Sequence, residues 1–171
     1  IKNLCLAGGV ALNCVANGKI LQNGKFKNIW IQPAAGDAGG SLGAALGLWH
    51  IELKKNRTIN AKDGMNGSYL GPEYSQNEVE KKLKELNTNF EVLDDEQLFE
   101  KTALELSNGK TVGWFQGRAE FGPRALGNRS ILGDARSENM QKILNLKVKF
   151  RESFRPFAPS IIREDLPTWF N

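Results

Sequence analysis

The sequence is poor in histidine and cysteine and has no long apolar run. His50 is the only histidine among the 171 residues, which leaves catalytic mechanisms based on histidine almost without support. Neither Cys5 nor Cys14 has a partner at the spacing of a metal site, so we expect two reduced thiols in the core. Apolar runs such as residues 44–49 are far shorter than the roughly 20 residues of a membrane span, so we expect no membrane-spanning segment and no membrane partner.

Several common catalytic signatures are also missing. The sequence has no Walker-type phosphate loop, no glycine-flanked nucleophile elbow and no zinc-ligand cluster. The first residues lack an initiator methionine, a basic start and the cleavage site of a secretion signal. We therefore expect a cytoplasmic protein and a chain that begins inside a longer polypeptide.

Positive charge is concentrated in one stretch. Residues 1–109 carry 12 Lys or Arg and 13 Asp or Glu, whereas residues 110–155 carry 10 Lys or Arg against 4 Asp or Glu. A local excess of this size indicates a surface that meets an anionic ligand.

The first part of the chain has the pattern of an α/β unit. The predicted elements are a strand near residues 4–6, a helix over about 11–22 ended by Gly24, a strand at 28–32 and a helix over about 41–55. A Gly8-Gly9 turn and a loop at residues 33–40 join them. This order predicts a β-α-β-α arrangement with two glycine-bearing loops.

Residues 56–68 are polar and without periodicity, which is typical of a linker. We place a domain boundary there, so that the first domain covers residues 1–65 and the second covers residues 66–171. The predicted elements of the second domain are helices at 76–86, 96–107 and 139–148 and strands at 90–93 and 111–116. Ser75 and Glu78 have the spacing of a capping box at the first of these helices. The second domain is therefore also predicted to be α/β.

Two glycine loops are candidate binding sites. Gly8 and Gly9 allow close approach of a ligand to the backbone before a helix, but on structural grounds alone a tight strand-to-helix turn is the favoured explanation. In the second loop, glycines surround Asp37 just before a helix, where a phosphate or a metal can bind. The alternative is that Asp37 only caps the helix. Two such loops in one unit favour nucleotide binding.

The cations of the second domain fall into two clusters. Arg118, Arg124 and Arg129 alternate with apolar residues and glycines, and a second cluster contains Lys149, Arg151 and Arg155. Guanidinium groups suit bidentate recognition of phosphate, while a structural ion pair remains the alternative for each arginine. As a group they indicate an anionic ligand.

Four motifs carry a resemblance to a known family. They are CLAGGVALN (Cys5–Asn13), PAAGDAGGSLGAA (Pro33–Ala45), GRAEFGPRALGNRSIL (Gly117–Leu132) and KFRESFRPFAPS (Lys149–Ser160). Together they resemble the C-terminal part of the NodU/CmcH carbamoyltransferases. The resemblance implies the end of a Kae1-like domain with an actin-like ATPase fold, followed by a YrdC-like α/β domain, truncated at both ends.

The resemblance also implies an activity. In such enzymes the YrdC-like domain uses ATP and carbamoyl phosphate to make carbamoyl adenylate and pyrophosphate. The Kae1-like domain then transfers the carbamoyl group to a hydroxyl of a sugar or natural-product acceptor. We expect the missing N-terminal domain of the same protein as a partner.

The roles of single residues follow from the same resemblance. The expected grip on carbamoyl phosphate and the ATP phosphates comes from Arg124, Lys149 and Arg155, with Arg118 and Arg151 as further candidates. The expected nucleotide-binding positions are Gly8, Gly9, Val10, Asn13, Gly39 and Gly40. Asp37 resembles the carboxylate ligand of an Fe²⁺ whose two histidines belong to an upstream HxxxH motif absent from this sequence.

Because that histidine pair and a further C-terminal arginine are missing, we expect the 171-residue chain alone to be inactive. The alternative is a nucleotide- or RNA-binding module without catalysis, since GWFQGRAEFGPR mixes aromatic residues with arginine. The basic residues cluster at two motifs rather than along a stripe, so we do not expect nucleic acid as a partner. A sugar-kinase-like or glycoprotease-like ATPase would fit residues 1–55 alone, and the second domain argues against it.

Overall fold

A computed structural model describes residues 1–60 and 62–170. These residues form two compact units, each built from two segments of the chain. The first unit consists of Ile1–Leu86 and Phe115–Arg129, and the second of Asn87–Trp114 and Ser130–Asn171. The division into domains of residues 1–65 and 66–171 stays a prediction about folding domains.

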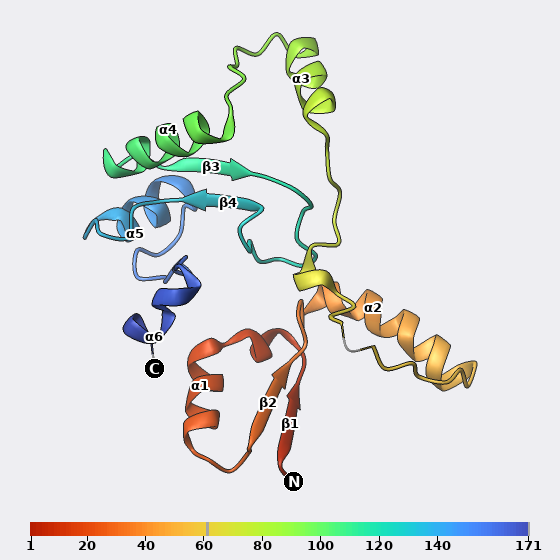
Figure 1. Cartoon of the computed structure of the whole chain (residues 1–171). Coiled ribbons are helices and arrows are strands. Elements are labelled where there is room, and N and C mark those ends of the chain that lie inside the picture. Colours follow the sequence, from red (N-terminus) through yellow and green to blue (C-terminus); the bar gives the residue numbers. More distant parts are fainter. Residues whose placement is uncertain (61, 171) are drawn as a thin grey trace. The chain divides into compact units, whose positions relative to one another are not determined.

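The first unit opens with the predicted strand, turn and helix (Figure 1). Its elements are β1 (Asn3–Leu6), the 3₁₀ turn η1 (Gly9–Leu12), α1 (Cys14–Gln22) and β2 (Asn28–Ile31). β2 pairs with β1 in parallel, and the intervening helix provides the crossover connection that parallel strands need. The helix begins later than predicted because Asn13 is its N-cap, where Oδ1 accepts a hydrogen bond of 3.1 Å from the Ala16 amide. Gly24 follows the helix end with a φ of 71°, as expected.

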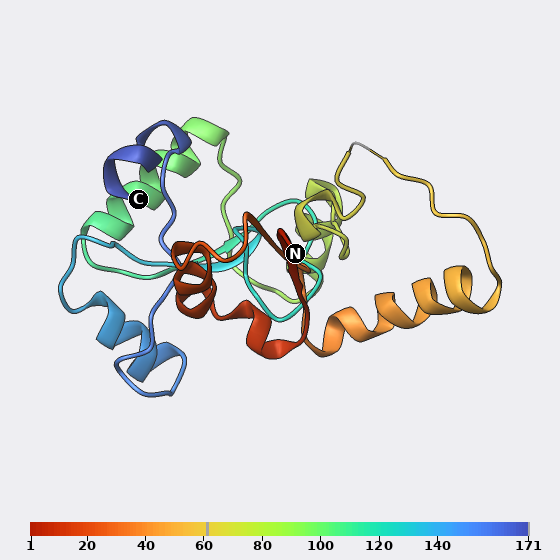
Figure 2. The same ribbon diagram turned by 90° about the horizontal axis from the view of Figure 1, so that it is seen from below.

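The second helix begins four residues earlier than predicted. α2 (Asp37–Gly47) runs directly into the π-helical turn η2 (Leu48–Glu52), and Figure 2 shows the two as one continuous helix. Gly36 is the N-cap, and the Asp37 carboxylate lies in the first turn, where the helix dipole favours a negative charge. The glycines at 39 and 40, which predicted a loop, are therefore part of the helix.

The rest of the first unit is mostly irregular. The short 3₁₀ turn η3 (Asn66–Ser68) follows the predicted linker, and α3 (Gln76–Glu85) follows it. The predicted capping box is confirmed, because the Ser75 side chain accepts from the Glu78 amide and the Glu78 side chain accepts from the Ser75 amide. Residues 115–129 complete this unit.

The second unit contains the remaining elements. They are α4 (Asp95–Ser107), β3 (Val112–Phe115), β4 (Arg129–Leu132), α5 (Met140–Ile143), the π-helical turn η4 (Leu144–Val148), η5 (Arg163–Asp165) and α6 (Leu166–Trp169). β3 and β4 form a two-stranded sheet, and their ends belong to the first unit. The predicted helices at 96–107 and 139–148 and the strand at 111–116 are confirmed, but the strand at 90–93 is wrong. No strand among the described residues pairs with that segment, and a strand needs a partner for its backbone.

Few apolar side chains are fully buried. Among the described residues the buried ones are Ala11, Ala35, Met140 and Leu144, together with polar Ser68 and Asn145. A two-stranded sheet leaves its faces open, and Trp30 of β2 is 53% exposed. The same openness makes the prediction of core thiols wrong, since Cys5 and Cys14 are unpaired but exposed. No helix in the described part of the chain is long and apolar enough to cross a membrane.

Candidate functional site

The two glycine loops lie against each other at the carboxyl ends of β1 and β2. The Gly8 amide donates a hydrogen bond of 2.7 Å to the Ala35 carbonyl oxygen. A Cβ on Gly36 would lie 3.8 Å from the Gly9 Cα, so the backbones are nearly in contact. The carboxyl edge of adjacent parallel strands is the usual position for a ligand in an α/β fold.

The helix start that follows the second loop has a constrained geometry. Ala34 has a φ of 52°, a backbone angle that residues other than glycine rarely adopt. A Cβ on Gly39 would collide with the Ala34 carbonyl oxygen. Gly39 is therefore required for local packing, whereas a Cβ on Gly40 would meet open space. Val10 is exposed. The Asn13 side chain is already used as the cap of α1.

Asp37 lies exposed at the start of α2. Within residues 1–60 and 62–170, no group of three or more His, Cys, Asp or Glu side chains is placed to hold a metal ion. Asp37 can thus supply one oxygen ligand, and the described residues do not by themselves fit an iron site.

The arginine-bearing loop at residues 117–128 is organised by Glu120. A single carboxylate oxygen, Oε1, accepts hydrogen bonds from three amides: Leu126 at 2.7 Å, Asn128 at 2.9 Å and Arg129 at 3.2 Å. Burial raises the pKa of the Glu120 carboxyl. The hydrogen bonds from these three amides and from the Glu120 amide outweigh that effect and lower the pKa from 4.5 to about 2. The group is ionised at neutral pH.

Arg129 is a structural residue rather than a free cation. Its Nη1 donates to the carbonyl oxygens of Gln116 at 2.6 Å and Asn128 at 2.9 Å, and its Nη2 donates to Gly117 at 3.0 Å and Pro72 at 3.3 Å. The guanidinium also stacks on the ring of Phe115, 3.5 Å from the centroid. These contacts leave Arg129 little capacity to bind a ligand.

Arg124 and Arg118 lie in the same loop but differ in their partners. Arg124 is exposed and, among the described residues, has no ion pair or side-chain hydrogen bond. It lines a cavity of about 310 Å³ whose other lining residues are Leu12, Pro33, Ala34, Gly67, Ser68, Phe121, Pro123 and Leu126. Arg118 lies 3.7 Å from the Glu73 carboxylate in an exposed pair. Such a pair contributes little to stability and can rearrange around a ligand.

The cavity joins the glycine loops to the arginine loop. A Cβ on Gly122, which has a φ of 111°, would lie 2.7 Å from the Ala34 Cβ. The Phe121 amide donates to the carbonyl oxygen of buried Ser68 at 2.6 Å. The loop at residues 33–40, predicted to bind a nucleotide, is therefore in direct contact with the arginine-bearing loop at residues 117–128, predicted to bind an anion. Both loops belong to the first unit.

The second cluster of predicted cations lies in the second unit, after η4. Asn145 is fully buried there; its Nδ2 donates to the carbonyl oxygens of Ser153 and Arg155, and its Oδ1 accepts from Arg151 Nε at 2.6 Å. The Arg151 guanidinium also lies over the Phe157 ring.

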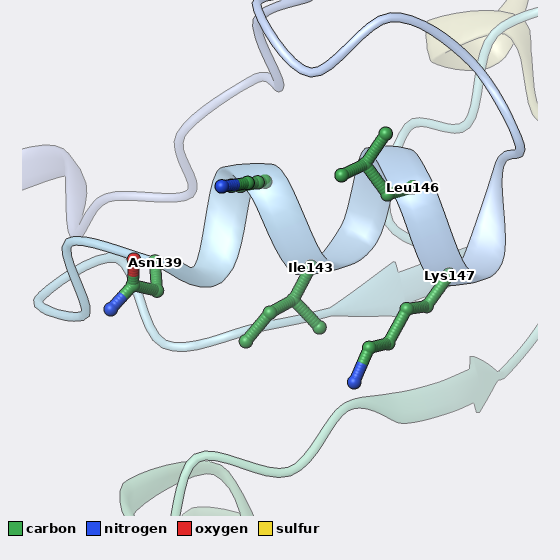
Figure 3. Close-up of a pocket in the computed structure, with 5 residues that line it drawn as sticks. Asn139, Ile143, Leu146 and Lys147 are labelled. Carbon is green, nitrogen blue, oxygen red and sulfur yellow. The ribbon is translucent and has the colours of Figure 1, made fainter.

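The two outer cations of this cluster are exposed. Arg155 pairs with Glu152 at 2.8 Å, while Lys149 has no ion pair within the described chain. A surface pocket of about 290 Å³ on the preceding helix is lined by Asn139, Lys142, Ile143, Leu146 and Lys147. Figure 3 shows Ile143 and Lys147 on one side of the helix.

Two protein-family models match the sequence, one in its N-terminal part and one in its C-terminal part. A family model described as the carbamoyltransferase N-terminus matches residues 1–46, and one described as the carbamoyltransferase C-terminus matches residues 103–171. The chain belongs to the carbamoyltransferase family.

Several proteins are similar to this carbamoyltransferase-family chain over almost its whole length. An uncharacterized protein of Synechocystis sp. is 59% identical over 99% of this chain and 28% of its own length. Nodulation protein NolNO of Sinorhizobium fredii is 44% identical over 99% of the chain and 25% of its own length, and nodulation protein NolO of Bradyrhizobium diazoefficiens is 44% identical over 98% and 30%. The chain thus spans less than a third of the length of these relatives.

Sequence reasoning missed two residues, Glu120 and Asn145, which hold the two cation-bearing segments of this carbamoyltransferase-family chain. It named Arg129 among the arginines expected to meet an anionic ligand, whereas the Arg129 guanidinium binds backbone carbonyls. The signals that could have found them are a carboxylate within a basic motif for Glu120 and an asparagine at an apolar helix position for Asn145. Arg118 and Arg124 lie in the first unit and Lys149, Arg151 and Arg155 in the second, so their common grip on one phosphate stays a prediction.

Proposed function

We propose that the protein is an O-carbamoyltransferase that converts ATP and carbamoyl phosphate into carbamoyl adenylate. The carbamoyl group then passes to a hydroxyl of a sugar or natural-product acceptor. The observation that carries the proposal is Arg124, an exposed guanidinium without an ion pair among the described residues, at a cavity between two family motifs. A planar guanidinium in this position suits bidentate binding of a phosphate.

The two parts of the chain have different proposed roles. We propose that residues 1–65 are the end of a Kae1-like, actin-like ATPase domain and that residues 66–171 belong to a YrdC-like domain. The parallel pairing of β1 with β2, with a glycine loop after each strand, supports ATP binding at that edge. The proposed contacts to ATP are made by Gly8, Gly9, Val10, Asn13, Gly39 and Gly40.

Charge explains why cations are needed. Carbamoyl phosphate, ATP and one water give carbamoyl adenylate, pyrophosphate and phosphate, so negative charge accumulates on phosphoryl oxygens during both cleavages. Fixed cations at those oxygens stabilise the transition state by several kcal/mol in total. Arg124 and Lys149 are the proposed main contributors because neither has an ion pair among the described residues. Arg155, Arg118 and Arg151 would assist after exchanging their present partners.

Iron is a separate part of the proposal. Asp37 would contribute one carboxylate oxygen to Fe²⁺, which acts as a Lewis acid when bound. Since the described residues offer no complete ligand set, we assign no step to the metal.

The test uses the protein at its full natural length with ATP, labelled pyrophosphate and carbamoyl phosphate. We expect label to enter ATP only when carbamoyl phosphate is present. Arg124→Ala should lower this exchange roughly 100- to 1,000-fold, the usual cost of removing one fixed charge-stabilising donor. Absence of exchange with carbamoyl phosphate present, together with tight and steeply salt-dependent RNA binding, would instead support a binding module without catalysis.

A further inference from the structure

Glu120 is an acidic side chain inside the most basic stretch of the chain, yet it forms no ion pair within the described residues. Its Oε1 instead accepts the amides of Leu126, Asn128 and Arg129 at 2.7, 2.9 and 3.2 Å. These bonds tie the start of the motif to its end and close the intervening backbone into a loop. A charged acceptor makes each bond stronger than a neutral one.

The closed loop contains one cation, Arg124. The backbone on both sides of Arg124 is held by further contacts: the Phe121 amide donates to the Ser68 carbonyl oxygen at 2.6 Å, and Tyr69 Oη donates to the Leu126 carbonyl oxygen at 2.5 Å. Pro123, directly before Arg124, has a fixed φ. The Arg124 side chain therefore extends toward the cavity from a backbone whose conformation is restricted on both sides.

We propose that Glu120 is a positioning residue for Arg124. It sets where the guanidinium can reach by holding the far end of the loop, and it makes no contact with substrate. This inference rests on the proposed role of Arg124 in binding phosphate. A shift of about 1 Å in a positioned group can cost about 100-fold in rate, so loss of the Glu120 bonds should have a large effect on catalysis.

Other roles fit Glu120 less well. With a pKa of about 2, the carboxylate is a weak base and does not accept a proton from a substrate near neutral pH. Its Oε1 is occupied by the three amides, and no group of metal-binding side chains surrounds it in the described part of the chain. What remains is control of the loop.

The experiment compares replacements of Glu120 in the full-length protein, by pyrophosphate–ATP exchange at varied carbamoyl phosphate concentration. Glu120→Gln keeps an oxygen at the Oε1 position without the charge and should lose at most about 10-fold in kcat/KM. Glu120→Asp keeps the charge but is one methylene shorter, and Glu120→Ala removes the acceptor; each should lose about 100-fold. If Glu120→Ala does not fold, the comparison of the glutamine and aspartate variants still tests whether Glu120 positions Arg124. A loss in Glu120→Gln equal to or greater than that in Glu120→Asp would overturn the proposal.

A double-mutant cycle separates positioning of Arg124 from a general structural role. In the Arg124→Ala background, Glu120→Asp should lower kcat/KM less than threefold further, because the group it positions is already gone. An undiminished 100-fold loss in that background would refute the link while leaving the proposed function intact. If Arg124→Ala alone has no effect, the proposed role of Arg124 fails and the positioning role fails with it.

Discussion

Replacing Asn145 with alanine should release the segment that carries Lys149, Arg151 and Arg155. Asn145 is 0% exposed, and its amide nitrogen holds the carbonyl oxygens of Ser153 at 3.1 Å and Arg155 at 2.8 Å. Its carbonyl oxygen accepts from Arg151 Nε at 2.6 Å. One side chain thus fixes three points of the segment.

The expected cost follows from these bonds. Two neutral hydrogen bonds contribute about 1 kcal/mol each, and a bond to a charged donor contributes about 1.5–3 kcal/mol. Because the released carbonyls can partly turn to water, we expect about 2–3 kcal/mol in total. At 1.4 kcal/mol per factor of ten, local opening becomes about 30- to 150-fold more frequent.

Amide hydrogen exchange measures this opening directly. The Lys149 amide donates to the Leu144 carbonyl oxygen at 2.9 Å and the Arg151 amide to that of Asn145 at 3.0 Å, so both report on the segment. Asn145→Asp should accelerate exchange as well, since a second oxygen would face the Ser153 and Arg155 carbonyls. Asn139→Ala is the matched control, because Asn139 is exposed at the start of the same helix and its side chain makes no capping bond. An acceleration below threefold in Asn145→Ala, or an equal one in Asn139→Ala, would refute the reasoning.

Three further predictions concern the arginine loop. Gly122→Ala should destabilise the first unit by about 2–4 kcal/mol in urea unfolding, because a Cβ would strain a φ of 111° and collide with Ala34. Arg129→Lys should cost about 2 kcal/mol by the same measurement, since a lysine cannot reproduce the four carbonyl contacts and the stacking on Phe115. Acid should weaken the loop: the Glu120 pKa rises from about 2 to 4.5 on unfolding, so its contribution is complete above pH 4.5 and is lost as the pH falls toward 2. The shift corresponds to at most about 3–4 kcal/mol, and solvent screening reduces this to about 1–2 kcal/mol.

Each of these has its own control. Gly40→Ala adds a Cβ in open space near the same loops, and a loss of stability as large as that of Gly122→Ala would contradict the packing argument. Arg118→Lys changes an exposed arginine with one weak pair and should cost less than about 0.5 kcal/mol. For the acid prediction, Glu120→Gln should show a smaller loss of stability between pH 7 and pH 3 than the original protein; identical pH profiles would show that the carboxylate is not responsible.

Local signals predicted the elements that depend on local contacts. The capping box at Ser75 and the glycine that ends the first helix were readable because all the atoms involved lie within a few residues. The strand at 90–93 failed because a strand depends on a distant partner that its own residues do not reveal.

The candidate site shows the same limit more sharply. Arg124 and Arg129 are the same residue type in one motif, yet one lines a cavity and the other binds four backbone carbonyls. The deciding partners of Arg129 include Pro72, 57 residues away in the sequence. Composition and spacing predicted a phosphate-binding motif, but only the contacts separate the cation available to a ligand from the one that builds the loop.

The engagement of Arg129 has a practical consequence for chemical labelling. Phenylglyoxal and related dicarbonyl reagents must reach two guanidinium nitrogens at once, and in Arg129 both terminal nitrogens are bonded while the plane is covered by an aromatic ring. Modification within this motif should therefore concentrate on Arg118 and Arg124. Mass-spectrometric footprinting with and without carbamoyl phosphate would then test, in unmutated protein, whether this compound protects Arg124.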